Sequence, residues 1–255
     1  MPAPLADVLA EAERLLEPAR FEDFCLNGLQ VPGGGERVAT LASGVSAHAE
    51  LFERAAAEHA ELLIVHHGLF WGSGVTAIDP PLKRRLQILF EAGIALAAYH
   101  LPLDAHAELG NNALLARALG ATELQPFADH RGQPIGFLAT LGAPSPSAPE
   151  LEASLLSLTG REPLGFAFGP ERIERLAVVT GAGAGYIDEA ARSGAHALLT
   201  GEVPERAMAE AREAAIHLFA AGHYATETFG IRALGEHLAE RFGLRHVFID
   251  VPNPV

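Results

Sequence analysis

Leu62-Leu63-Ile64-Val65-His66-His67-Gly68 is the most informative stretch of this sequence, because an apolar run ends there in two adjacent histidines. A short, continuously apolar run is typical of a strand that is buried on both faces of a sheet. Two further apolar runs are followed by similar residues. The segment Ala97–Asp104 contains a histidine and an aspartate, and the segment Phe219–Glu227 contains a histidine and a glutamate. Side chains just beyond the carboxyl ends of parallel strands project into the crevice where α/β proteins bind ligands. The three segments therefore predict one shared metal site.

Strand and helix patterns alternate along the whole chain. In the first half we expect strands at Val38–Val45, Leu62–Val65 and Ile94–Tyr99, and helices at Pro4–Glu17, Ala47–His59, Leu82–Ala92 and Asn111–Leu119. In the second half we expect strands at Leu176–Val179, Ala197–Leu199, His217–Ala220 and Val247–Ile249, and helices at Pro149–Leu158, Tyr186–Ser193, Pro204–Ala215 and Phe229–Arg241. This alternation indicates the α/β fold class.

The alternating pattern of the first half ends near Pro126, which suggests a division into two lobes. We expect an amino-terminal α/β lobe at residues 1–125 and a carboxyl-terminal α/β lobe at residues 126–255, each with a mixed, largely parallel sheet. Two such lobes facing each other would bring their strand ends to a shared metal-binding cleft.

Composition excludes several classes of protein. The formal net charge of -14 argues against a general nucleic-acid-binding surface, because such surfaces neutralise phosphates with cationic side chains. The single cysteine, Cys25, excludes an intrachain disulfide and is expected to be a small buried hydrophobic residue. No secretory signal is apparent, and no apolar stretch approaches the roughly 20 residues that a membrane-spanning helix needs. We expect a cytoplasmic protein without a membrane partner.

The candidate ligands favour a dinuclear metal centre. His66 and His67 point to opposite sides of an extended backbone, so two neighbouring ions could use both more easily than one ion. His223 and Glu227 share one face if a helix begins near Gly222, and the Asp104 carboxylate can bridge two cations. Imidazole and carboxylate ligands suit zinc, manganese or iron better than calcium or magnesium. Such a pair, about 3.5–4 Å apart, activates a bridging water and polarises the substrate.

Other readings of these residues stay open. A single buried histidine is more often a core residue with satisfied hydrogen bonds than a ligand, and the three segments count only in combination. His100 is a candidate proton shuttle, a partner that orients a ligand, or a substrate-binding group. Glu202 is a second candidate proton shuttle. The glycine-rich stretch Thr180–Gly185 can be read as an anion-binding loop or, more simply, as a tight turn between a strand and a helix.

The chain resembles the Nif-three-like dinuclear metal proteins, the GTP cyclohydrolase I type 2 homologs, in their short bacterial form. The resemblance covers nearly the whole chain, weakens between Gln125 and Arg172, and is carried by Asn27–Val31, His66–Trp71, Tyr99–His106, Leu109–Asn112, Thr200–Val203, Ala221–Glu227 and Phe248–Pro254. It implies two metal ions per chain on His66, His67, Asp104, His223 and Glu227, and a ring-shaped homohexamer. The segment Glu202–Arg206 departs from the pattern, where many members have an aspartate and a downstream histidine.

Two functions follow from these observations. The first is a metal-dependent hydrolase acting on a small molecule, with GTP as the substrate that the resemblance implies. In that reaction the imidazole ring of guanine opens and formate is released, with His100 or Glu202 moving protons. The alternative is a non-enzymatic metal-handling or metal-delivery protein, and a hydrolase of another small molecule is a third reading. The acidic composition weighs against a triphosphate unless cations such as those of Lys83–Arg85 assist.

Overall fold

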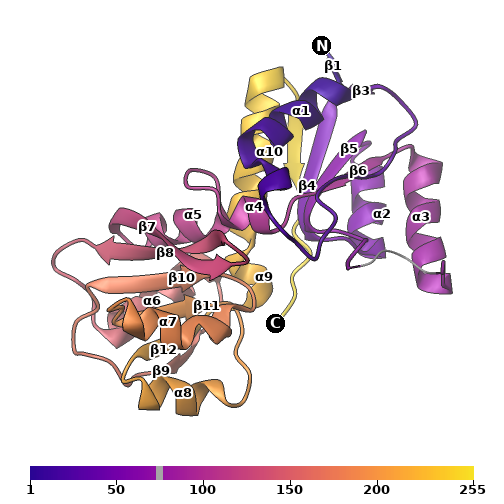
Figure 1. The fold of residues 1–255 in the computed structure, drawn as a ribbon. Helices are drawn as coiled ribbons and strands as arrows, with labels where there is room; N and C mark the ends of the chain where they lie inside the picture. Colours follow the sequence, from indigo (N-terminus) through magenta and orange to yellow (C-terminus); the bar gives the residue numbers. More distant parts are fainter. Residues whose placement is uncertain (73–76) are drawn as a thin grey trace. The chain divides into compact units, whose positions relative to one another are not determined.

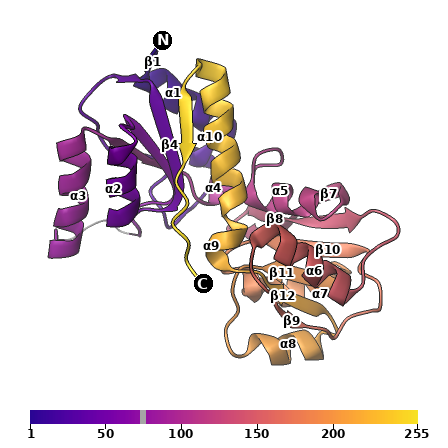
Figure 2. The same ribbon diagram turned by 180° about the vertical axis from the view of Figure 1, so that it is seen from behind.

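The chain folds into two compact units, seen in a computed structural model that describes residues 1–72 and 77–255. The first unit contains residues 1–103 and 231–251, and the second contains residues 104–230 and 252–255. Figures 1 and 2 show the same ribbon from opposite sides, with the first unit coloured purple and yellow and the second magenta to orange. The fold class is confirmed as mixed α/β.

A five-stranded sheet forms the centre of the first unit, in the order β13-β4-β5-β6-β2. Its strands are β13 (Arg245–Phe248), β4 (Thr40–Ser46), β5 (Leu62–His67), β6 (Ala95–Ala98) and β2 (Gly28–Val31). All neighbouring strands are parallel except β6 and β2. The carboxyl ends of β4, β5 and β6 therefore lie along one edge of the sheet.

Helices cover both faces of this sheet, with α2 (Ala49–Ala57) and α3 (Pro80–Ala92) on one side and α1 (Leu5–Leu16) and most of α10 (Thr228–Phe242) on the other (Figures 1 and 2). The His48 and Asp79 side chains cap the amino termini of α2 and α3. The smaller elements are β1 (Ala3–Pro4), η1 (Pro18–Arg20) and β3 (Arg37–Val38).

The core of the first unit explains why β5 is continuously apolar. Leu63 and Val65 of β5 pack with Leu51 and Phe52 of α2 in one buried cluster, so α2 covers this face of the strand. Cys25 belongs to the same cluster, as expected for a small hydrophobic residue. Its burial raises the pKa of the thiol to about 11, so the thiol stays protonated.

A six-stranded sheet forms the centre of the second unit, in the order β7-β8-β10-β11-β12-β9. Its strands are β7 (Ala121–His130), β8 (Gln133–Leu141), β10 (Arg175–Val179), β11 (Ala197–Thr200), β12 (His217–Ala220) and β9 (Leu164–Phe166). The pairs β10–β11 and β11–β12 are parallel, and the other three pairs are antiparallel. This sheet is therefore more mixed than the sequence suggested.

The helices of the second unit include α5 (Asn111–Ala118) and α6 (Ala148–Thr159), which share one apolar core with strands β8, β10, β11 and β12. The others are η2 (Gly183–Tyr186), α7 (Ile187–Arg192), α8 (Ala207–Glu213) and α9 (His223–Thr226). A four-residue helix, α4 (Leu101–Asp104), connects the first unit to the second.

The hairpin formed by β7 and β8 was not predicted from the sequence. The turn residues Arg131 and Gly132 have φ of 53° and 87°, the two positive values that a two-residue type I′ turn requires. Pro126 lies within β7 and is tolerated because β7 is an edge strand. The expected division between residues 125 and 126 would cut this strand, and the compact units divide instead at Leu103 and at Gly230.

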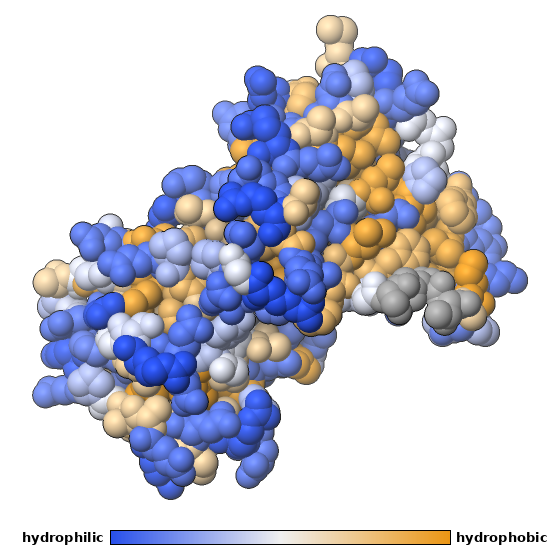
Figure 3. All heavy atoms as spheres, viewed as in Figure 1, coloured by the Kyte–Doolittle hydropathy of each residue, from blue (hydrophilic) through white to orange (hydrophobic). Residues whose placement is uncertain are grey.

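An apolar groove of about 400 Å³ lies on the first unit, away from the metal-ligand types. Pro4, Leu5 and Leu9 line it together with Leu29 and Pro32, and Glu36 adds one carboxylate. Figure 3 shows hydrophobic surface (orange) on this unit, near where α1 and β3 lie in Figure 1. Among the described residues, no helix has the length and apolar character needed to cross a bilayer.

Candidate metal centre

Three histidines of the first unit gather at the edge where β5 and β6 end. His66 and His67 are the last residues of β5, and His100 lies two residues beyond the end of β6. One nitrogen from each of the three rings lies within 4.8 Å of the others, a spacing that could hold a metal ion. The sequence had suggested His66 and His67 as metal ligands and His100 as a proton shuttle, and the structure brings the three side chains together.

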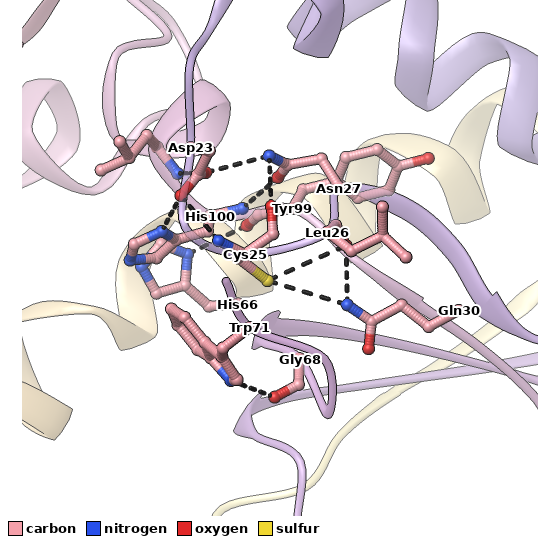
Figure 4. A network of polar contacts seen from close by, with 11 residues as sticks. Asp23, Cys25, Leu26, Asn27, Gln30, His66, Gly68, Trp71, Tyr99 and His100 are labelled. Carbon is pink, nitrogen blue, oxygen red and sulfur yellow. Dashed lines mark hydrogen bonds and ion pairs between the residues drawn. The ribbon is translucent and has the colours of Figure 1, made fainter. Parts of the chain in front are cut away.

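Each ring is anchored through its Nδ1 atom, which leaves Nε2 as the nitrogen suited to a metal or a proton. His66 Nδ1 lies 3.0 Å from the carbonyl oxygen of Tyr99, and His67 Nδ1 lies 3.0 Å from Ser46 Oγ. His100 Nδ1 lies 2.8 Å from the Asp23 carboxylate (Figure 4). Hydrogen bonds of this kind fix the orientation of a ligating imidazole and raise its basicity. Neither Asp23 nor Ser46 was singled out from the sequence.

Trp71 packs against this cluster and remains 41% exposed. Its ring lies 5.1 Å from that of His100 and 5.9 Å from that of His67, measured between centroids. The indole Nε1 donates to the carbonyl of Gly68, as Figure 4 shows. Because Trp71 is the only tryptophan of the chain, its fluorescence reports directly on the histidine cluster.

In the second unit, Asp104 ends α4 and is held by polar groups of neighbouring elements. Asn111 Nδ2 donates to Asp104 Oδ1 at 2.8 Å, and Thr180 Oγ1 lies 3.5 Å from the same oxygen. Asn112 Nδ2 donates to the backbone carbonyls of Ile135 and Asp104. The two asparagines, buried at the start of α5, therefore fix both the carboxylate and the backbone of Asp104. In the sequence analysis these asparagines appeared only within the Leu109–Asn112 motif of the family resemblance.

His223 and Glu227 lie together at α9, as the i, i+4 spacing predicted. His223 Nε2 lies 3.3 Å from Glu227, and His223 Nδ1 lies 3.4 Å from Glu202 on the other side of the ring. Burial opposes a charge on His223, but hydrogen bonds and charge from Glu227 and Glu202 outweigh it and raise the pKa of His223 to about 9. Carboxylate oxygens of Asp104 and Glu227 also lie within 4.8 Å of each other.

The glycine-rich stretch after β10 is a tight turn that allows close approach to these ligands. Gly181 has a φ of +64°, and a Cβ there would lie 2.3 Å from Glu227 Oε1 and 3.2 Å from His223 Nε2. Its carbonyl oxygen accepts from Gly201 N, Glu202 N and Thr200 Oγ1. The turn interpretation of this stretch is therefore confirmed, and Gly181 serves to make room for Glu227.

The donor atoms of both units suit a transition metal. They are imidazole nitrogens and carboxylate oxygens, and the imidazoles have hydrogen-bonding partners that orient them. Calcium and magnesium sites use oxygen ligands almost alone, which the three histidines of the first unit do not provide. These side chains fit zinc, manganese or iron.

Comparisons with known proteins agree over the full length of the chain. The family model described as Duf34/NIF3 (NGG1p interacting factor 3) matches residues 3–254. A Pseudomonas aeruginosa protein named "GTP cyclohydrolase 1 type 2 homolog" is 43% identical over 250 residues, 98% of each chain. An Escherichia coli K12 protein of the same name is 43% identical over 240 residues, 94% of each chain.

Solved structures give the same result. The structure of protein ybgI, described as of unknown function, has a TM-score of 0.92 and 40% identity, and the match covers 99% of this chain and 100% of that one. TTHA1606 from Thermus thermophilus has a TM-score of 0.91 and 38% identity with the same coverage. HcgD from Methanocaldococcus jannaschii, at 21% identity and a TM-score of 0.84, shares the fold. The chain belongs to the Duf34/NIF3 family.

Proposed function

We propose that the protein is a dinuclear-metal hydrolase. The side chains that would hold the two divalent ions are those expected from the sequence, His66, His67, Asp104, His223 and Glu227. The observation that carries this proposal is the anchoring of the candidate ligands: Tyr99 and Ser46 hold the two histidines of β5, Asn111 holds Asp104, and Glu202 holds His223. Side chains oriented in this way by polar partners are typical of metal ligands.

In this proposal the metal ions supply an activated water and polarise the bond to be cleaved. Side chains of the protein transfer the proton and orient the ligands. His100 Nε2 accepts a proton from the attacking water, because its Nδ1 is engaged by Asp23. Glu202 lies 3.4 Å from His223 Nδ1, where it can orient that ring, and it remains the second candidate proton shuttle.

GTP is the substrate we favour, because the relatives with about 43% identity carry the name of a GTP cyclohydrolase homolog. The reaction would open the imidazole ring of guanine and release formate. The net charge of -14 makes cationic help for the triphosphate necessary. Arg84, in the basic cluster of α3, already pairs with Glu53 at 2.8 Å. The metal ions, the other cations of the Lys83–Arg85 cluster and other chains would have to supply the remaining positive charge.

The alternative function is metal handling or metal delivery without turnover, and hydrolysis of another small molecule is a third possibility. A carrier should exchange its metal readily, whereas an enzyme should keep a coordination position for water or substrate and turn substrate over. Anchored imidazoles and carboxylates favour the enzyme, because a rigid ligand set slows exchange. The homohexamer and the cytoplasmic location that the sequence suggested remain parts of the proposal.

Formate release from GTP is the first test. The protein is loaded with manganese or zinc, and the metal content per chain is counted on the same sample. We expect formate release that falls at least 100-fold in Asp104→Ala, because Asp104 would hold the metal ions that the reaction needs. Two bound metals without formate would rule out GTP as the substrate and favour metal handling or another substrate. Fewer than one metal per chain would contradict the dinuclear site.

Trp71 fluorescence tests the metal position in the first unit without any substrate. We expect micromolar Co²⁺ to quench the fluorescence reversibly, since Trp71 contacts His67 and His100. His67→Ala should reduce the quenching. His237 lies beside Glu11 of α1, so His237→Ala should leave the quenching unchanged. Bound Co²⁺ that leaves the fluorescence unaltered would place the metal elsewhere.

A further inference from the structure

A dense polar network of the first unit centres on Asp23, which enters the proposed function only through its contact with His100 (Figure 4). Each carboxylate oxygen accepts two hydrogen bonds. Oδ1 accepts from Cys25 N at 3.0 Å and from His100 Nδ1 at 2.8 Å. Oδ2 accepts from Asn27 Nδ2 and Leu101 N, both at 2.9 Å. With its side chain only 2% exposed, Asp23 is a buried and fully hydrogen-bonded carboxylate.

This network determines which nitrogen of His100 carries the proton. An ionised carboxylate is only an acceptor, so His100 Nδ1 must be the donor. In the neutral ring the lone pair then lies on Nε2. Burial opposes ionisation of Asp23, but the hydrogen bonds and charge of His100, with further bonds from Asn27 and Cys25, outweigh it and lower the pKa of Asp23 to about 2. The carboxylate is therefore ionised at every physiological pH.

The network also fixes the position of the ring. Asn27 Oδ1 accepts from His100 N at 2.8 Å, so the backbone of His100 is held as well as its side chain. The ring packs 5.0 Å from that of His66 and 5.6 Å from that of His67. With Nδ1 bound to Asp23, Nε2 is the His100 nitrogen available to the cluster of three histidines.

We propose that Asp23 is a positioning residue for His100: it holds Nδ1–H so that Nε2 is presented, as a proton acceptor, beside His66 and His67. This inference rests on the proposed hydrolase function. Formate release takes two hydrolytic rounds, because the substrate carbon is bonded to two ring nitrogens. In each round an O–H bond of one water breaks, its proton moves to Nε2, and the oxygen bonds to the substrate carbon. One C–N bond then breaks, the nitrogen that leaves takes the proton from Nε2, and the second round frees the carbon as formate. Asp23 stabilises the charged ring between these two transfers.

The first experiment tests the tautomer and needs no turnover. Solid-state ¹⁵N NMR on protein with ring-labelled histidine distinguishes Nδ1–H from Nε2–H, and comparison with His100→Gln identifies the His100 signals among those of the 12 histidines. At pH 8 we expect His100 to be protonated at Nδ1 in the wild type and to lose this state in Asp23→Leu. An Nε2–H ring in the wild type, or an unchanged signal in Asp23→Leu, would overturn the proposal.

The second experiment separates positioning from simple structural support, and it uses Asp23→Asn because this variant keeps the shape of the side chain. We expect kcat for formate release to fall about 100-fold while KM and the metal content per chain stay within threefold. Asp23→Glu, which keeps the charge, should recover part of the rate, and Asp7→Asn on the exposed face of α1 serves as the control.

A double-variant cycle completes the test. In a His100→Gln background, Asp23→Asn should cost no further activity, because Asp23 acts through His100. A large additional loss, or loss of metal from Asp23→Asn, would contradict the positioning role. If GTP gives no formate at all, the proposed reaction fails, but the NMR result still decides whether Asp23 fixes the His100 tautomer.

Discussion

Gly181→Ala should lower metal affinity about 10- to 100-fold, the range typical of changes beside a metal ligand. The substitution places a Cβ 2.3 Å from Glu227 Oε1, and alanine is disfavoured at a φ of +64°. The turn cannot shift to relieve the contact, because the Gly181 carbonyl accepts three hydrogen bonds from the segment at residues 200–202. Glu227 must therefore move.

A control lies four residues further on, in η2. A Cβ on Gly185 would meet no atom within 4 Å, so Gly185→Ala should bind metal as the wild type does. Competition with a chromogenic chelator measures both affinities. If Gly181→Ala and Gly185→Ala bind metal equally well, Glu227 is not a ligand.

Asn112→Ala should lower the free energy of unfolding by about 3 kcal/mol, which is a large loss for a single substitution. Asn112 is 1% exposed and joins three elements of the second unit. Its Oδ1 accepts from Thr180 N at 2.7 Å, and its Nδ2 donates to the carbonyls of Ile135 and Asp104. Alanine would leave these buried backbone groups without that partner and would also open a small cavity.

Urea unfolding, followed through the transition that includes the second unit, measures this loss. Asn253→Ala removes an asparagine from the exposed carboxyl-terminal segment and should change the midpoint little. A loss below about 1 kcal/mol in Asn112→Ala would mean that water replaces the hydrogen bonds of Asn112.

The parts of the fold that the sequence predicted are those with a strong local pattern. The apolar runs of β5 and β12 and the helical pattern of α1 lie where expected. The β7–β8 hairpin was not predicted, because β7 is an exposed edge strand that contains Pro126 and lacks a clear alternation of apolar and polar residues. Its turn signal, Arg131-Gly132, is weaker than the Asn-Gly or Asp-Gly pair that usually marks such a turn.

In the candidate site, too, only the residues marked by a local pattern could be predicted. Histidines and carboxylates after buried strands could be recognised, because the residue types and the strand ends are both local. Their partners could not, because the pairs are distant in sequence: Asp23 is 77 residues from His100, and the Thr180 amide is 68 residues from Asn112. Such contacts depend on strand register and on loop paths, which no short pattern encodes.

The order of the strands in the first unit has a consequence for synthesis of the chain. β4 pairs with β5, which follows it closely, and with β13, which is the last strand of the described chain. The segment 104–230, which forms nearly all of the second unit, lies between them in sequence. At ribosomal rates of roughly 5–20 residues per second, β13 emerges roughly 7 to 30 s after β6. During this interval the β13-facing edge of β4 lacks its native partner strand, and exposed edges of this kind promote aggregation. The sheet that begins the chain is therefore completed only after every strand of the second sheet has been synthesised.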